Sequence, residues 1–260
     1  MRASAPETTG AGWAVGPWPP APPGPGVVHV WAATVGERGE ELEALEATLA
    51  PDERARAGRL VRPADRVRYT VAHGILRRVL AGYLEVAPES LVFASGSQGK
   101  PVLVPPAAAP WPDLRFNLSH SGDAVLVAVA IGCDVGVDIE SPERPLHADT
   151  IAQRHFPPAE WEHLRPLPEP ERHAAFLRSW VCKEAFAKGT GAGLGGVALW
   201  SIACLPDAEG ALGLVGTSVA SRRLLRGWAV VELPAFLGYP AALAVAGTSP
   251  DACCWRFPVP

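Results

Sequence analysis

An uninterrupted apolar run, Ala124–Ile131 (AVLVAVAI), is the feature that most restricts the fold of this chain. Eight residues are few for a buried helix, and a strand that is apolar at every position must be covered on both faces. After a turn at Gly132-Cys133-Asp134, residues 135–140 (VGVDIE) form the next expected strand, which we expect to pair with the first in a hairpin. A sheet covered by protein on both sides is therefore predicted near the middle of the chain.

Other patterns place helices and strands on both sides of this run. Further strands are expected at 27–34, 92–95, 101–104, 200–205, 228–233 and 241–246, and helices at 40–49, at 51–83 with a break at Pro63, and at 176–188. The elements before residue 132 and those after it each mix strands with helices. The fold class is therefore α+β with two similar halves, 27–131 and 132–250. The Pro- and Gly-rich segment 1–26 predicts a disordered or extended leader.

Composition narrows the class of protein. The chain has 260 residues and a formal net charge of −4, so no overall basic excess points to nucleic acid. The five cysteines lack C-x-x-C spacing, which favours neither a disulfide framework nor a zinc site and fits a reducing cytoplasm. No apolar run reaches the roughly 18 residues of a membrane helix, so no membrane partner is expected.

Two carboxylates, Asp138 and Glu140, are the first candidate site residues. They are two positions apart in an expected strand and so project to one face, while Val137 and Ile139 take the other face. Carboxylates that repel each other are a suitable pair for Mg²⁺, which prefers oxygen ligands. The competing interpretation is two exposed acids at the end of a strand.

The chain contains only three lysines among its 23 basic residues, at positions 100, 183 and 188. Lysine is a compact, mobile point charge where arginine is a rigid fork. Trp180, Lys183, Glu184 and Lys188 have the spacing of one helical face, which predicts a third carboxylate flanked by two ammonium groups. An amphipathic helix with an internal Glu184–Lys188 pair explains the same pattern.

The segment 116–122 (FNLSHSG) reads as a polar turn that leads into the buried run. Ser119, His120 and Ser121 offer donors to an anion, although a capping turn is an equal alternative. A Ser–His hydrolase is disfavoured, because adjacent turn residues rarely form a nucleophile–base pair and no G-x-S-x-G motif occurs. The arginines between 54 and 68 form either a solvated helix face or a phosphate cradle.

Taken in order, these segments resemble the Sfp-type 4′-phosphopantetheinyl transferases. The resemblance covers about 27–247 and rests on GKP (99–101), FNLSHSG (116–122), VGVDIE (135–140) and WVCKEAFAKGTGAGL (180–194), with the arginine-rich helix before them and GYPAALAVAG (238–247) after them. Each motif alone is weak, and four in one order are specific.

The resemblance implies two halves related by a pseudo-twofold axis, with coenzyme A (CoA) bound between them. It implies Mg²⁺-dependent transfer of 4′-phosphopantetheine from CoA to a serine of an apo acyl or peptidyl carrier protein, releasing adenosine 3′,5′-bisphosphate. The N-terminal half would bind CoA, and the C-terminal half would bind the metal and catalyse transfer. The implied metal ligands are Asp138, Glu140 and Glu184, and the implied catalytic residues are Glu184 as base, Lys188 and Asp138. The implied CoA contacts are Arg59, Arg68, Lys100, Pro101, Ser119, His120 and Lys188.

Further expectations concern partners and competing functions. The segment 141–165 is the expected docking surface for the carrier, and a cytoplasmic monomer is expected because one chain supplies both halves. The heavy use of Ala, Arg, Pro and Gly is associated with a GC-rich genome, from which a role in bacterial secondary metabolism is expected. A noncatalytic module that binds carrier protein or CoA and a Mg²⁺-dependent phosphohydrolase that needs no carrier are the alternatives. The three carboxylates argue against the first alternative.

Overall fold

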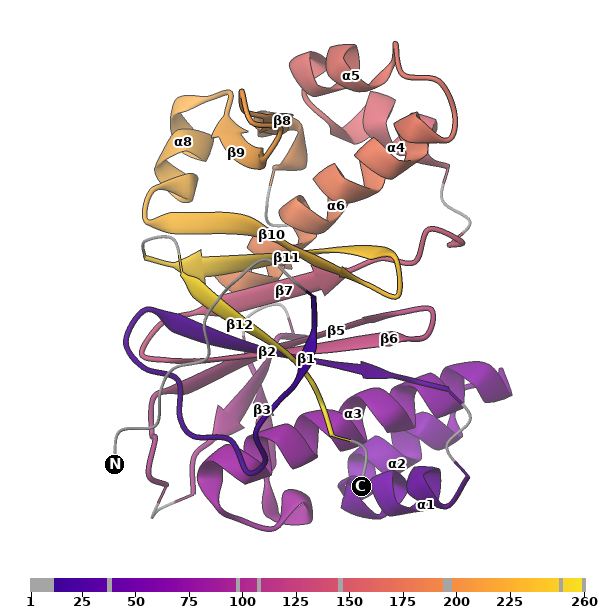
Figure 1. Cartoon of the computed structure of the whole chain (residues 1–260), viewed down its shortest axis with the longest axis vertical. Helices are drawn as coiled ribbons and strands as arrows, with labels where there is room; N and C mark the ends of the chain where they lie inside the picture. The colour runs from indigo at the N-terminus through magenta and orange to yellow at the C-terminus, as the bar shows by residue number, and fades with distance from the viewer. Residues whose placement is uncertain are drawn as a thin grey trace.

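Two groups of helices enclose the sheets of this protein (Figure 1). The computed structural model describes residues 12–36, 39–96, 99–106, 109–144, 147–193, 198–247 and 250–258. The helices of the N-terminal half lie on one side of the molecule and those of the C-terminal half on the other, with the two larger sheets between them (Figure 1). The mixture of helices and sheets confirms the α+β class.

The larger sheet belongs mainly to the N-terminal half and has the strand order β1-β12-β2-β6-β5. Its strands are β1 (Ala14–Val15), β2 (Val27–Thr34), β5 (Leu114–Ser121), β6 (Ala124–Ile131) and β12 (Asp251–Arg256). One face packs on the long helix α3 (Pro63–Leu84), where Val125, Val127 and Val129 of β6 join the core. Helices α1 (Gly39–Thr48) and α2 (Pro51–Gly58) pack beside α3.

A second sheet, with the order β10-β11-β7, covers the other face. Its strands are β7 (Val135–Ile139), β10 (Trp228–Phe236) and β11 (Tyr239–Ala246). Alternate residues of β6, including Leu126 and Ala128, pack against β7 and β11. The outer face of this sheet supports α6 (Glu171–Thr190), so the layers run helix, sheet, sheet, helix. Burial of β6 on both faces explains why all eight of its residues are apolar.

The remaining elements lie at the periphery. They are the one-turn 3-10 helix Pro88–Ser90, β3 (Val92–Ser95), β4 (Pro101–Val104), α4 (Ala148–His155), α5 (Pro158–Leu164), the 3-10 helix Leu199–Ser201, β8 (Ile202–Pro206), β9 (Leu212–Gly216) and α8 (Val219–Leu225). Strands β3 and β4 form a hairpin, as do β8 and β9. None of the described helices combines the length and the apolar composition that crossing a membrane requires.

The expected hairpin between 124–131 and 135–140 is wrong. Both segments are strands, but β6 pairs with β2 and β5, and β7 pairs with β11 in the other sheet. Both edges of β6 are already occupied, so the short turn after it passes into the next layer. The segment 116–122 is likewise a strand rather than a polar turn, because it forms most of β5 and the bend follows at Gly122.

The disordered leader is wrong for the part that the structure describes, while residues 1–11 lie outside the described residues. Ala14 and Val15 pair in parallel with β12, and the Trp13 indole donates to the carbonyl oxygen of Pro234 at 3.1 Å. Trp18 packs edge-on against Trp31. Tryptophans between the prolines bury enough apolar surface to order this segment. Residues 251–256 also join the larger sheet as β12, although the sequence predicted no strand in this segment.

Candidate active site

Asp138 reaches the site because β7 alternates its side chains between two layers. Val137 and Ile139 enter the core between the sheets, and Gly136 and Asp138 face α6. A Cβ atom at Gly136 would lie only 2.1 Å from the Ala185 carbonyl oxygen, so this position must be glycine for α6 to pack so closely. The contact brings the C-terminal part of α6, which carries Glu184 and Lys188, against the strand.

Three side chains from three elements meet at one carboxylate oxygen. Lys188 Nζ lies 2.6 Å from Asp138 Oδ1, and the Ser119 hydroxyl donates to the same oxygen at 2.8 Å. Lys188 also donates to Ser119 Oγ at 2.9 Å. The second oxygen, Asp138 Oδ2, is buried and has no hydrogen-bond partner among the described residues. Because a buried acceptor without a donor is costly, this oxygen is a suitable ligand for a cation.

Glu140 repeats this arrangement two residues later. The Ser121 hydroxyl donates to Glu140 Oε2 at 2.7 Å, and Arg144 forms an ion pair with Oε1. The backbone N–H of Val137 donates to Asn117 Oδ1 at 2.9 Å and so holds β5 beside β7. Burial is the main reason that the pKa of Glu140 is raised. Both serines of the FNLSHSG segment thus support a carboxylate of the VGVDIE segment.

Glu184 contributes the third carboxylate to the same pocket. The pocket has a volume of about 220 Å³, and its lining residues are Leu118, Ser119, His120, Asp138, Ile139, Glu140, Arg144, Glu184 and Lys188. The pKa of Glu184 is raised to about 7, mainly by burial and next by the charge of Asp138, while Lys188 opposes the shift. This pKa gives the carboxylate a balance of acid and base forms near neutral pH.

Basic groups gather at one end of this pocket, beside the turn between β5 and β6. Arg68 Nε donates to the Gly122 carbonyl oxygen at 3.1 Å, and its guanidinium pairs with Asp65 at 3.0 Å. The pKa of His120 is lowered to about 4, first by desolvation, although part of this residue stays exposed, and then by the nearby His73, Lys188 and Arg68. The concentration of cationic groups favours an anionic ligand here.

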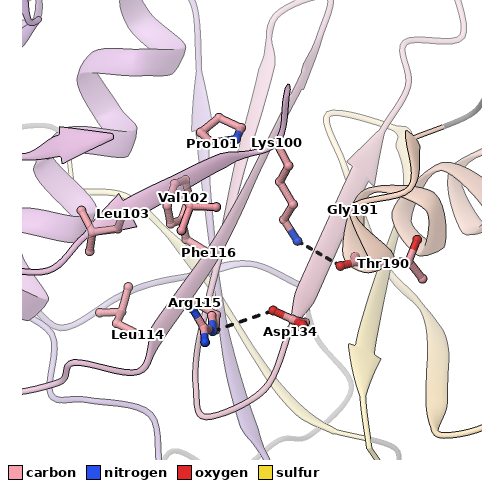
Figure 2. A pocket seen from close by; sticks show the side chains of 11 residues that line it. Lys100, Pro101, Val102, Leu103, Leu114, Arg115, Phe116, Asp134, Thr190 and Gly191 are labelled. Carbon is pink, nitrogen blue, oxygen red and sulfur yellow. Dashed lines mark hydrogen bonds and ion pairs between the residues drawn. The ribbon is translucent and has the colours of Figure 1, made fainter. Parts of the chain in front are cut away.

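Lys100 and Pro101 lie elsewhere, in a smaller pocket of about 140 Å³ between the β3–β4 hairpin and the end of α6 (Figure 2). Figure 2 shows Lys100 directed towards α6, and its ammonium donates to the carbonyl oxygens of Val135 at 3.1 Å and Gly189 at 3.0 Å. A cavity of about 230 Å³ is lined by Lys100 and Pro101 and also by Leu118 and Lys188 of the carboxylate pocket. Three hollows therefore follow one another along the junction of the two halves.

The carboxylates provide the donor chemistry of a magnesium site without a finished cage. Among the described residues, no group of three or more His, Cys, Asp or Glu side chains is arranged to hold a metal ion. The oxygens of Asp138 and Glu140 contact Lys188 and Arg144 instead. Mg²⁺ usually takes one or two carboxylates, with waters and substrate phosphates. The partnerless Asp138 Oδ2 and the shared pocket fit such a site, so these residues have the oxygen ligands that the ion prefers.

Lys183 is not part of the site, and the expectation of two ammonium groups beside Glu184 is wrong. Its side chain is fully buried on another face of α6, 2.6 Å from Glu160 and 4.0 Å from the centre of the Phe156 ring. It also donates to the carbonyl oxygen of Ile202 at 2.6 Å. Neighbouring helical residues point about 100° apart, and a second acid, Glu160 of α5, determines where Lys183 points.

One expected residue, Arg59, lies outside the pockets, and two residues that the sequence analysis did not name lie at or near the site. Arg59 is exposed at the end of α2 and is not among the described residues that line the pockets above. Arg144 and His73 were missed. Arg144 lies four residues after Glu140, in the segment expected to be the docking surface, and His73 is on α3 with its ring stacked on Tyr69 at 4.0 Å. For Arg144, the sequence offered one weak signal, which is a basic residue four positions after an acidic residue at the end of a strand.

Comparisons with known proteins agree on one family. Residues 34–131 match the family model "4′-phosphopantetheinyl transferase, N-terminal", and residues 134–237 match the model "4′-phosphopantetheinyl transferase superfamily". The chain is 37% identical to 4′-phosphopantetheinyl transferase HetI of Nostoc sp. strain PCC 7120, over 92% of this chain and 98% of that protein. The two matched ranges meet at the turn after β6.

More distant proteins carry related names. The L-aminoadipate-semialdehyde dehydrogenase-phosphopantetheinyl transferase of Mus musculus is 31% identical over 64% of this chain and 56% of its own length. The solved holo-[acyl-carrier-protein] synthase of Neisseria meningitidis is 22% identical and covers 44% of this chain and 98% of its own, with a TM-score of 0.38, a likeness too slight to argue from.

Proposed function

The chain belongs to the 4′-phosphopantetheinyl transferase superfamily, and on that premise we propose that it transfers 4′-phosphopantetheine from CoA to a serine of an apo acyl or peptidyl carrier protein. It is an enzyme of the transferase class, as its relatives are. The observation that carries the proposal is the pocket in which Asp138, Glu140, Glu184 and Lys188 meet at the junction of the halves. Adenosine 3′,5′-bisphosphate is the proposed second product.

The proposed chemistry needs a base and a positive charge for the leaving group. The carrier serine oxygen forms a bond to the phosphorus next to the pantetheine arm, the bond from that phosphorus to the bridging oxygen breaks, and the electron pair leaves with the bisphosphate. Glu184, with a pKa of about 7, is suited to accept the serine proton. Lys188, fixed by Asp138 and Ser119, donates to the diphosphate.

Asp138, Glu140 and Glu184 are the proposed ligands of Mg²⁺. The support is their shared pocket, the partnerless Asp138 Oδ2 and the raised pKa values of Glu140 and Glu184, because crowded carboxylates favour a bound cation. When bound, the ion would neutralise charge on the diphosphate. Without it, Lys188 and Arg144 balance the charges of Asp138 and Glu140.

The hollows along the junction are the proposed CoA site. Lys100 and Pro101 would border the nucleotide, Lys188 the diphosphate, and Ser119, His120, Arg59 and Arg68 the 3′-phosphate region. Arg68 has the better support of the two arginines, because it contacts the turn beside the pocket and Arg59 is exposed on α2.

The proposed carrier-docking surface is the segment 141–165, which includes α4 and α5 and continues from Glu140. Arg154 and Arg165 supply positive charge there. Charge reversal at either arginine should raise KM for the carrier and leave CoA binding unchanged. If neither reversal alters KM for the carrier, docking lies elsewhere. We also propose a cytoplasmic monomer, supported by the five free cysteines and by a site built within one chain.

The direct test is the intact mass of an apo carrier protein after incubation with this protein, CoA and Mg²⁺, with an EDTA control. We expect a gain equal to one phosphopantetheine arm, and its loss with EDTA. CoA cleavage without a carrier would favour a phosphohydrolase. No mass gain with any of a panel of acyl and peptidyl carriers, while CoA still binds, would favour a noncatalytic module.

A further inference from the structure

Lys100 joins the two halves at a single ammonium group. It follows the β3–β4 turn of the N-terminal half, and both of its hydrogen-bond acceptors belong to the C-terminal half. The Val135 carbonyl oxygen is at the start of β7, three residues before Asp138. The Gly189 carbonyl oxygen is in the last turn of α6, one residue after Lys188. The ammonium therefore contacts the two elements that carry the site.

The Gly189 contact has the character of a helix cap supplied from another part of the chain. The last four carbonyls of a helix lack partners within it, and the helix dipole makes this end negative. Helix α6 ends at Thr190, with Gly191 in the left-handed conformation at a φ of 67°. An ammonium at the Gly189 carbonyl oxygen satisfies one orphan acceptor and interacts favourably with the dipole.

The ammonium also spans the closest approach between strand and helix. A Cβ atom at Gly136, the neighbour of Val135, would lie 2.3 Å from the Gly189 backbone nitrogen. Lys100 holds the backbone on both sides of this contact, at 3.1 Å and 3.0 Å. One residue before Gly189 on α6, Lys188 forms its 2.6 Å contact with Asp138. A shift of α6 along β7 would lengthen that contact first.

We propose that Lys100 is a positioning residue that fixes α6 against β7, and that its ammonium is not a nucleotide ligand. The proposal rests on the transferase function argued above and changes the role that the resemblance implies for this side chain. A lysine suits the position because one small nitrogen serves two carbonyls, where the planar guanidinium of arginine needs a wider space. Arg115, with a side chain 45% exposed in the same pocket, faces Asp134 at 3.8 Å and makes neither of the two carbonyl contacts.

The test compares Lys100→Met with Arg115→Gln, which removes a charge from the same pocket and leaves the two carbonyl contacts intact. Calorimetry measures Kd for CoA and for adenosine 3′,5′-bisphosphate, and steady-state kinetics give kcat and KM with an apo carrier. We expect Lys100→Met to lower kcat about 10- to 100-fold, the size expected from a small misplacement of reacting groups. Its Kd for both nucleotides should stay within about twofold of the wild type. Arg115→Gln should keep kcat.

A second measurement tests whether α6 is held in place and does not depend on enzyme activity. Amide hydrogen exchange in the last turn of α6 should become faster in Lys100→Met and remain unchanged in Arg115→Gln. If Lys100→Met does not fold, Lys100→Gln, which keeps one amide donor, takes its place.

Three results would overturn the proposal. They are a tenfold or larger rise in Kd for CoA with kcat intact, an unchanged kcat, and unchanged exchange at α6. A wild-type protein that modifies no carrier would instead refute the transferase function, and the exchange and nucleotide-binding measurements would still decide the role of Lys100.

Discussion

Helix α6 carries an acid–lysine contact on each of two faces, and the two differ in almost everything except residue type. On the pocket face, Lys188 has 30% of its side chain exposed and Asp138 has 4%. On the packed face, Lys183 and Glu160 are both at 0%. The pocket contact has two carboxylate neighbours, Glu140 and Glu184, and open space beside it. The packed contact is enclosed by Phe156 and the backbone of β8.

The difference shows that one face of α6 contributes to the candidate site and another contributes to the stability of the fold. A pair next to a cavity can exchange its partners for a substrate or a metal, so its charges are useful because they are incompletely satisfied. A fully enclosed pair has no such freedom, and removing one partner leaves an uncompensated buried charge. We therefore expect changes on the pocket face to alter activity and changes on the packed face to alter stability.

The largest expected effect is on turnover from the pocket face. Glu184→Gln and Asp138→Asn keep the side-chain shapes and remove a base or a charge. We expect kcat to fall by about 10²- to 10⁴-fold in each, because proton transfer and charge stabilisation both depend on these groups. In Glu184→Gln the free energy of unfolding should change little or rise, since the charge that burial and Asp138 disfavour is removed. Mass spectrometry of the carrier and urea unfolding measure the two quantities, and wild-type-like turnover would end the assignment of these residues.

The next effect is on stability from the packed face. Lys183→Met leaves Glu160 buried without its partner, and we expect the free energy of unfolding to fall by about 3–5 kcal/mol. The double variant Lys183→Met/Glu160→Gln should recover a large part of that loss, because no charge is then left buried. Any loss of turnover should follow the fraction unfolded. A stable Lys183→Met protein with a reduced kcat would place Lys183 in the chemistry after all.

A pH dependence tests the raised pKa of Glu184 on the pocket face. The pKa of folded Glu184 is about 7 against a usual 4.5, so the neutral form is favoured on folding. Its contribution to stability is complete below about pH 4.5 and is lost as the pH rises through 7. In EDTA, the wild type should therefore lose about 1–3 kcal/mol between pH 4.5 and pH 8 relative to Glu184→Gln. Parallel urea curves for the two proteins across this range would contradict the shift.

The strands could be predicted from the sequence more fully than their partners. The bounds of β6 agree with the apolar run, and β7 differs by one residue. Their pairing was missed because alternation describes the faces of one strand, whereas a hairpin depends on which edges other strands occupy. The same limit hid β12, whose place between β1 and β2 follows from the return of the chain end.

Motif chemistry selected the residues of the proposed site, and it did not predict how every side chain is oriented. Asp138, Glu140, Glu184 and Lys188 share one pocket as the spacing suggested. Lys183 differs because a helix face is defined by what packs on it, and Glu160 lies 23 residues earlier in a segment without a strong pattern. The Lys100 contacts were not predicted for a related reason. Their acceptors are backbone carbonyl oxygens, which every residue carries, so the sequence gives no sign of them.

The smallest expected effect comes from an acid–base pair that neither cavity nor core encloses. Arg165 and Glu162, three residues apart at the end of α5, are in contact at 2.6 Å, with 58% and 59% of their side chains exposed. Water screens such pairs, so Arg165→Ala should change the free energy of unfolding by less than about 0.5 kcal/mol and leave KM for CoA unchanged. Urea unfolding at low and high salt measures this. A loss approaching that of Lys183→Met would show that enclosure is not what makes the packed pair strong, and the contrast between the two faces of α6 would need another cause.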